Sequence, residues 1–232
     1  MKKIRLLKRL MQTGAYTREG ARELVKEGNV LVDKKRVTSE HFFIKEKSLV
    51  EVQGKKLMIQ KEKIYLMLNK PKEYVCQKTA KEKNVLELVK EKNIFVIGRL
   101  DKDTEGLLLL TNDGDYAHQV LSPEHHVEKE YLVILEKEIT QEEIKKLETG
   151  VAIDLETEIY TTKPCDVLKI NAREIKIRLR EGKKRQIRRM LEAVDNKVLE
   201  LKRIRIGNLL LGNLKLGTYR VLSKEEALQA LQ

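Results

Sequence analysis

One stretch of the chain, residues 98–114, constrains the fold and the chemistry more than any other. The strand-like segment Phe95-Val96-Ile97 leads into a polar loop, and four leucines at 107–110 follow that loop. The loop reads Gly98-Arg99-Leu100-Asp101-Lys102-Asp103-Thr104-Glu105-Gly106. Two apolar segments therefore hold several charged groups between them. A loop of this kind calls for a chemical explanation.

The pattern of this loop allows three interpretations. Asp101, Asp103, Glu105 and Gly106 match the spacing of an EF-hand-like calcium loop, but Asn112 stands where the last, bidentate glutamate is required. The acids could instead form a solvated turn between two strands. Alternatively, one carboxylate could be a catalytic group that a cation such as Arg99 keeps ionised. The missing ligand argues against calcium, and spacing cannot choose between the other two.

Positive charge is concentrated at the start of the chain. The 232 residues include 48 Lys and Arg against 36 Asp and Glu, a formal net charge of +12. Residues 1–59 hold 15 basic and 7 acidic side chains, a net of +8, and the rest of the chain carries +4. This skew favours a polyanion-binding module at the N-terminus, for nucleic acid or an anionic membrane surface, over a merely solvated basic surface.

Cysteine, histidine and hydropathy patterns narrow the class of protein. Cys76 and Cys165 form no Cys-x-x-Cys pair, which argues against a disulfide framework or zinc and fits a reducing cytoplasm. His118, His125 and His126 lack a further ligand at metal-site spacing, so no metal is expected. Apolar runs of about four residues are too short to span a membrane, and no signal-peptide core follows the basic start. We expect a cytoplasmic protein.

Residues 1–59 predict two short basic helices followed by strands. Apolar side chains recur at helical spacing over residues 4–12. Thr17 is placed as the N-cap of a second helix, and Gly28 as its stop. Residues 30–32 then predict a strand, and residues 48–52 with 56–59 predict a hairpin about Gln53-Gly54.

This order of elements resembles the S4 RNA-binding domain, particularly over residues 17–33, Thr17-Arg18-Glu19-Gly20-Ala21-Arg22-Glu23-Leu24-Val25-Lys26-Glu27-Gly28-Asn29-Val30-Leu31-Val32-Asp33. The resemblance implies that the helix pair and the loop after it face RNA phosphates, with the candidate contacts Lys2, Arg5, Arg18, Arg22, Lys26, Lys34 and Lys35. The chain departs from many members at Leu7, where they have an aspartate. Counterion release predicts that affinity falls steeply with salt.

Residues 60–232 form the second expected domain, with the junction near Lys61-Glu62-Lys63. Strands are predicted at residues 64–69, 129–135, 174–179 and 199–206, and helical segments at 85–89, 115–121 and 187–194. A capping box from Thr140 to Glu143 begins a further helix that Gly150 ends. Because these signals alternate without a steady βαβ order, we predict a mainly antiparallel α+β domain.

The stretch from Gly98 to Gly114 resembles the signature of the RNA pseudouridine synthases, in the branch that joins an S4 domain to a compact synthase domain. Three supporting segments follow in the family's order: Leu68-Asn69-Lys70-Pro71, Lys129-Glu130-Tyr131-Leu132-Val133, and Glu181-Gly182-Lys183-Lys184-Arg185-Gln186-Ile187-Arg188-Arg189-Met190. Together they span nearly the whole chain. The resemblance implies an enzyme that isomerises uridine to pseudouridine in RNA.

By this resemblance, Asp101 is the essential aspartate, Tyr131 packs against the target base, and Arg188 pairs with Asp101, with Arg185 as the alternative partner. Further candidate RNA contacts are Arg99, Arg185, Gln186 and Arg189. Asp103 and Glu105 are interpreted as loop-shaping or RNA-facing. Without the resemblance, a tyrosine at a strand entry is more often a core residue, and a basic cluster at a helix start could simply face solvent or phosphate.

The chemistry implied by the resemblance needs no cofactor. The N1–C1′ bond breaks, the base rotates, and C1′ joins C5, which requires a carboxylate near C1′ but no metal or redox group. Whether Asp101 adds to the sugar or removes a proton stays open. A target inside folded RNA has to be unstacked and flipped into the pocket, where Tyr131 stacks on it.

Several details concern the substrate. By resemblance to enzymes of small-subunit rRNA, residues 122–129 and Thr162-Lys163-Pro164 favour 16S rRNA, although residues 185–190 are also similar to some large-subunit enzymes. We expect a monomer that acts on 16S rRNA, either naked or partially assembled with ribosomal proteins. The same reaction on 23S rRNA is one alternative. A non-catalytic, S4-type ribosome assembly factor is the alternative from a different class.

Overall fold

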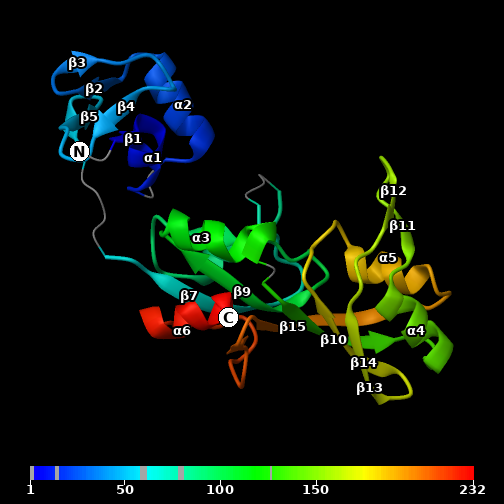
Figure 1. Cartoon of the computed structure of the whole chain (residues 1–232). Coiled ribbons are helices and arrows are strands. Elements are labelled where there is room, and N and C mark those ends of the chain that lie inside the picture. Colours follow the sequence, from blue (N-terminus) through cyan, green and yellow to red (C-terminus); the bar gives the residue numbers. More distant parts are fainter. Residues whose placement is uncertain (1–2, 14–15, 58–61, 78–80, 126) are drawn as a thin grey trace. The chain divides into compact units, whose positions relative to one another are not determined.

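The computed structural model describes residues 3–13, 16–57, 62–77, 81–125 and 127–232 (Figure 1). The chain divides into two compact units. The first comprises residues 1–64 with the short segments 91–95 and 111–114, and the second comprises residues 65–90, 96–110 and 115–232. The boundary expected between residues 59 and 60 lies outside the described residues.

The N-terminal unit places two helices against short strands. Its elements are β1 (Lys3–Arg5), α1 (Leu6–Met11), α2 (Arg18–Lys26), β2 (Val30–Val32), β3 (Lys35–Arg36), β4 (Phe43–Lys45), β5 (Val50–Val52) and β6 (Lys55–Lys56). The strands form a four-stranded sheet in the order β3-β2-β5-β6 and a separate antiparallel pair, β1-β4. Apolar residues of both helices and of these strands form one buried core.

Local sequence signals explain most of this unit. Thr17 caps α2, because its Oγ1 accepts a hydrogen bond of 3.1 Å from the N–H of Gly20. Gln53 and Gly54 both have positive φ and join β5 to β6 as predicted. The helix predicted over residues 4–12 is partly wrong, since residues 3–5 are extended. Ile4 pairs with Ile44 of β4, and this tertiary pairing overrides the helical spacing.

The second unit is built on one large sheet. Its elements are β7 (Tyr65–Lys70), β8 (Phe95–Ile97), β9 (Glu105–Thr111), α3 (Gly114–Leu121), β10 (Lys129–Leu135), α4 (Gln141–Thr149), β11 (Ala152–Asp154), β12 (Ile159–Thr161), β13 (Asp166–Asn171), β14 (Glu174–Leu179), α5 (Gln186–Glu192), β15 (Val198–Ile206), β16 (Leu209–Leu210), β17 (Tyr219–Val221) and α6 (Lys224–Leu228). Short 3₁₀ helices occupy Val85–Leu88, Pro123–His125 and Gln229–Leu231.

The main sheet runs in the order β13-β14-β10-β15-β9-β7-β17, with β16 paired to β15 and β8 to β9. Strand β14 pairs antiparallel with both β13 and β10. The pairs β10–β15 and β7–β17 are also antiparallel, whereas β9 runs parallel to β15. The predicted mainly antiparallel α+β fold is confirmed. The signature loop joins β8 to β9 near the middle of this sheet.

Two buried cores support the two halves of the sheet. Residues of β10, β14 and β15 pack with α4 and α5 in one core, and these helices lie beside that end of the sheet (Figure 1). Residues of β7 and β9 pack with α3 and α6 in the other core. The four-leucine run is fully buried as the middle of β9. The signature loop is therefore anchored to a rigid strand.

Candidate active site

The signature loop closes as a tight turn. The N–H of Thr104 donates to the carbonyl oxygen of Asp101 at 3.1 Å, and β9 begins at the next residue, Glu105. Gly106 then faces Arg203 of β15 so closely that a Cβ would lie 2.2 Å from its carbonyl oxygen. With φ at +108°, only glycine fits there. Sequence and sheet pairing thus fix where the turn lies.

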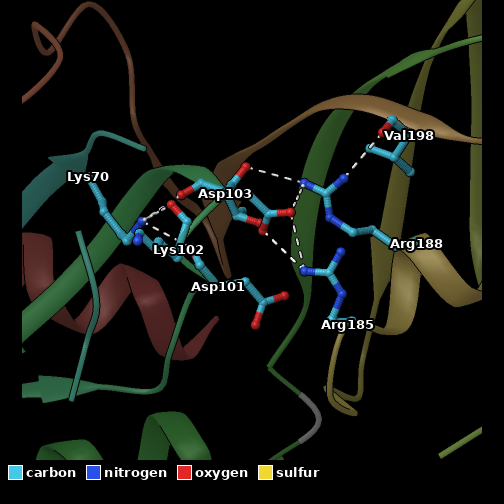
Figure 2. A network of polar contacts seen from close by, with 8 residues as sticks. Lys70, Asp101, Lys102, Asp103, Arg185, Arg188 and Val198 are labelled. Carbon is cyan, nitrogen blue, oxygen red and sulfur yellow. Dashed lines mark hydrogen bonds and ion pairs between the residues drawn. The ribbon is translucent and has the colours of Figure 1, made fainter. Parts of the chain in front are cut away.

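Lys70, at the end of β7, holds this turn through hydrogen bonds to its backbone, and we call this arrangement the clamp. Its side chain is fully buried. Its Nζ donates to the carbonyl oxygens of Asp101 at 3.0 Å and Thr104 at 2.8 Å, and also contacts those of Pro71 and Lys102 (Figure 2). Burial lowers the pKa of Lys70, whereas the nearby thiol of Cys76 and the loop carboxylates raise it. A buried ammonium therefore satisfies backbone carbonyls that the turn leaves unpaired.

Asp103 is held by two arginines from the start of α5. Arg188 Nη2 lies 3.1 Å from its carboxylate and 3.2 Å from its carbonyl oxygen, and Nη1 donates to the carbonyl oxygen of Val198 at 3.2 Å. Arg185 Nη1 contacts both carboxylate oxygens of Asp103 at 3.2–3.3 Å. The predicted pairing of Arg188, or of Arg185, with Asp101 is therefore wrong in this structure. The turn separates the two carboxylates, and only Asp103 faces both arginines.

The Asp101 carboxylate, unlike that of Asp103, has no partner among the described residues. It forms no hydrogen bond or ion pair with any other described residue, and it points away from the Lys70 contacts in Figure 2. It lines a cavity of about 570 Å³ together with Tyr131 of β10 and residues of the segment 179–187. The turn thus presents one partly buried, unpaired carboxylate to a cavity large enough for a nucleotide-sized ligand.

Tyr131 is oriented by a buried arginine. Arg203, opposite it on β15, donates from Nη1 to the Tyr131 hydroxyl at 3.5 Å and from Nε to the carbonyl oxygen of Leu107 at 2.8 Å. Arg203 is 3% exposed, and its Nη2 has no partner among the described residues. The buried hydroxyl of Thr104 likewise has none. Both residues belong to the wall of the cavity that Asp101 also lines.

Lys129 adds a partly buried cation to the cavity wall. Its Nζ donates to the carbonyl oxygen of Val127 at 2.9 Å. Burial, together with the neighbouring Arg203, lowers the pKa of Lys129 to about 8. Lys183 belongs to the basic segment, residues 181–190, and lines the same cavity. Its Nζ lies 4.2 Å from the centre of the Tyr160 ring.

The other predicted RNA contacts, two in the basic segment 181–190 and one in the signature loop, bind other side chains of the protein. Gln186 is buried and donates to Glu181, which also accepts from the Tyr160 hydroxyl. Arg189 pairs with Glu156 of the β11–β12 hairpin at 2.7 Å. Arg99 is exposed and donates to Gln77. Structure thus gives Gln186 and Arg189 an architectural role in addition to any contact with RNA.

The contacts predicted in the N-terminal unit lie mostly on its surface. Arg5, Arg18, Lys26, Lys34 and Lys35 are exposed. Arg22 pairs with Glu40 at 2.9 Å. Lys2 lies outside the described residues.

Sequence reasoning missed Lys70, Thr104, Lys129 and Arg203 as site residues. Two signals were present. Lys70 ends an apolar strand directly before Pro71, so it is a lysine in a buried position. Arg203 occupies an inward position of an alternating strand, where an apolar residue is expected.

In the described part of the chain, no helix is long and apolar enough to cross a membrane.

Comparison with known proteins agrees with this geometry. Residues 64–193 match the family model "RNA pseudouridylate synthase", and residues 4–50 match the S4 domain model. An uncharacterized RNA pseudouridine synthase of Aquifex aeolicus is 39% identical over 96% of this chain and 94% of its own length. Ribosomal small subunit pseudouridine synthase A of Vibrio cholerae is 38% identical over 96% and 97%, respectively.

A solved structure shows the same fold. The crystal structure of a pseudouridylate synthase has a TM-score of 0.73 to this chain at 30% sequence identity. It matches 98% of this chain and 99% of the other. With a family model that covers more than half of the residues and relatives that match along nearly the whole length, the chain belongs to the RNA pseudouridylate synthase family and is an isomerase that acts on RNA.

Proposed function

We propose that this enzyme isomerises a specific uridine of 16S ribosomal RNA and that Asp101 is the carboxylate that acts at C1′. The observation that carries the proposal is the contrast within one turn. Asp103 is neutralised by two arginines, whereas the Asp101 carboxylate has no partner in the described structure and lines the cavity beside Tyr131. A free, positioned carboxylate is what attack or proton removal at the sugar requires.

The reaction balances within the substrate itself. The N1–C1′ bond breaks, C1′ bonds to C5, the C5 proton is lost, and N1 gains a proton. Asp101 acts either by adding to C1′ or by removing a sugar proton to give a glycal. In both routes the carboxylate has to lie close to the ribose, and the Lys70 clamp together with Arg188 keeps the turn from shifting. Arg188 is therefore a positioning residue in this proposal.

Tyr131 is the proposed contact for the flipped base. Unstacking a base from folded RNA is unfavourable, and stacking on an aromatic ring recovers part of that free energy. Arg203 donates to the Tyr131 hydroxyl at 3.5 Å and so helps to hold the ring at the cavity wall.

The choice of 16S rRNA is supported by relatives. The Vibrio cholerae relative and one from Escherichia coli, 42% identical over 56% of this chain and 55% of its own length, are both named ribosomal small subunit pseudouridine synthase A. We further propose that the chain works in the cytoplasm as a monomer, on naked or partially assembled small-subunit rRNA. In this proposal the N-terminal unit holds the RNA through its exposed cations.

One experiment tests substrate and site together. The enzyme and Asp101→Asn are incubated with separate naked 16S and 23S rRNA and with partially assembled subunits, and pseudouridine is mapped by chemical adduct and primer extension. We expect one or few new modifications in 16S rRNA with the wild type. Asp101→Asn should bind RNA as well as the wild type but lose turnover by at least about a thousandfold. Asp103→Asn, two residues away, is the matched control and should retain measurable turnover.

Two results would contradict the proposal. Turnover by Asp101→Asn near that of the wild type would reject the role of Asp101. Modification confined to 23S rRNA would reject the substrate and leave the chemistry intact.

A further inference from the structure

The outward face of the β1–β4 pair carries an exposed phenylalanine among cations. The register pairs Lys3 with Lys45 and Arg5 with Phe43. Ile4 and Ile44 turn inward to the core, so the four side chains of these two pairs lie on the exposed face. Arg5 lies with its guanidinium carbon 5.8 Å from the centre of the Phe43 ring. We call these four residues, Lys3, Arg5, Phe43 and Lys45, the β1–β4 patch.

Phe43 and its neighbour Phe42 are among the exposed large apolar residues of the described chain. Aromatic residues make up only 4% of the sequence, and phenylalanine occurs three times. Phe43 is 53% exposed and its neighbour Phe42 is 40% exposed. Single exposed apolar residues are common, but two consecutive phenylalanines at the surface of a small, highly charged unit expose aromatic area that contributes little to its core.

The chemistry of the patch fits an unpaired nucleotide. A phenylalanine ring offers a face on which any base can stack, and neighbouring cations can bind the phosphates on either side. The patch has three cations and no carboxylate, which complements the charge of RNA. In a duplex the bases are stacked on each other and their faces are not accessible, so an aromatic platform favours single-stranded segments.

The patch shares a residue with the predicted RNA contacts, because Arg5 belongs to both. Glu40, in the turn before β4, pairs with Arg22 of α2 at 2.9 Å, and the N–H of Leu6 at the start of α1 donates to the carbonyl oxygen of Phe42 at 2.8 Å. The helices and the patch are thus joined within one compact unit.

We propose that the β1–β4 patch is a binding site for an unpaired nucleotide of the RNA substrate, with Phe43 stacking on the base and Lys3, Arg5 and Lys45 contacting the adjoining phosphates. This inference rests on the proposed RNA-binding role of the N-terminal unit. It adds a base-stacking site to a surface that otherwise binds through charge.

A tryptophan reporter tests the stacking directly. Because the chain contains no tryptophan, Phe43→Trp introduces a single tryptophan whose emission can be excited selectively over that of the seven tyrosines. In the full-length protein, an unstructured single-stranded RNA should quench this emission on binding, and a duplex of the same sequence should leave it nearly unchanged. Leu168→Trp is the control, since Leu168 is an exposed residue on β13 of the other unit. Emission from Phe43→Trp that does not respond to single-stranded RNA would overturn the proposal.

Affinity measurements separate stacking from charge. Phe43→Leu keeps an apolar side chain but removes the ring, and it should weaken binding of single-stranded RNA about tenfold, with the duplex little affected. The slope of affinity against salt should stay the same in this variant, whereas Lys45→Gln should lower it by about 0.7 for single-stranded RNA. Phe43→Trp should bind at least as well as the wild type. Unfolding midpoints confirm that each variant is folded.

Arg18→Gln, measured alongside, separates the two proposals. Weaker binding in Arg18→Gln with wild-type binding in Phe43→Leu would reject the patch alone and leave it as a surface for a protein partner. Unchanged binding in both would reject RNA binding by the whole N-terminal unit. Weaker single-strand binding in both supports the patch and the unit together.

Discussion

In the N-terminal unit, Arg18, Lys26, Lys34 and Lys35 are exposed and form no ion pair with another described residue. In the other unit, the cations of the basic segment are engaged: Arg185 and Arg188 with Asp103, and Lys184 and Arg189 with Glu156. The same residue types therefore serve two purposes. Exposed cations remain available for phosphates, whereas paired or buried cations set the shape of the active site.

The comparison has a physical basis. An exposed lysine or arginine stays hydrated and can exchange a counterion for a phosphate, so its contribution depends on salt. A buried cation has lost its hydration and needs carbonyl or carboxylate partners in return. Substitutions in the two units should therefore differ in the size of their effect. They should also change different properties: RNA affinity in the N-terminal unit, and stability or turnover in the other unit. Four predictions test this difference, beginning with the largest effect.

Lys70→Met should give the largest change, because it removes a buried charge that binds several carbonyl oxygens of the turn. We expect a loss of roughly 3 kcal/mol in the free energy of unfolding and at least about a hundredfold loss of turnover, since Asp101 is no longer fixed. Urea unfolding and single-turnover assays measure both. Lys72→Met, a nearby lysine outside the turn, is the control. A Lys70→Met enzyme with full activity would show that the clamp is dispensable.

Lys129→Met should change how stability depends on pH. Burial lowers the pKa of Lys129 from 10.5 to about 8. Between about pH 8 and 10.5 the unfolded chain holds a proton that the folded chain has released, so this group makes stability rise with pH in that window. The wild type should gain about 2 kcal/mol relative to Lys129→Met from pH 7.5 to 10. The measurement is urea unfolding at several pH values.

Lys145→Met, at an exposed helical position, should leave this rise intact. If Lys129→Met and the wild type show parallel pH profiles, Lys129 is not a buried cation in solution.

Arg188→Ala tests the ion pair at Asp103. The pair should contribute about 2 kcal/mol as a coupling energy, less than a fully buried pair, because the Asp103 side chain is 43% exposed. A double-mutant cycle with Asp103→Asn measures it. Turnover should fall with little change in RNA affinity, which distinguishes positioning from binding. Arg185→Ala, at the exposed partner of the same carboxylate, should have a smaller effect, and equal effects would contradict the different burial of the two arginines.

Arg18→Gln should give the smallest change at physiological salt. We expect a few-fold loss of RNA affinity, a shallower slope of log affinity against log salt by about 0.7–0.9, and unchanged turnover at saturating RNA. Fluorescence anisotropy over a range of salt concentrations measures the slope. A large loss of turnover at saturation would mean that this cation also shapes the active site, and the contrast between the units would fail.

Much of the fold was accessible from local patterns. The helix after Thr17, the helix from Thr140 to Gly150 and the strand at 129–135 follow from caps and hydrophobic spacing, and all three are present. Residues 4 and 5 were predicted as helix because their spacing is helical, but pairing with β4 makes them part of a strand. Such pairing partners lie far apart in the sequence, and spacing carries no information about them.

For the candidate site, too, some features follow from the sequence and others only from the tertiary structure. The sequence by itself determined the family, the signature loop, and the candidates Asp101 and Tyr131, because each belongs to a contiguous motif. Only the tertiary structure decided that Arg188 and Arg185 bind Asp103, that Lys70 clamps the turn, and that Arg203 orients Tyr131. The physical reason is that burial and partner choice depend on atoms brought together across the sheet, whereas a motif records only which residue types are neighbours along the chain.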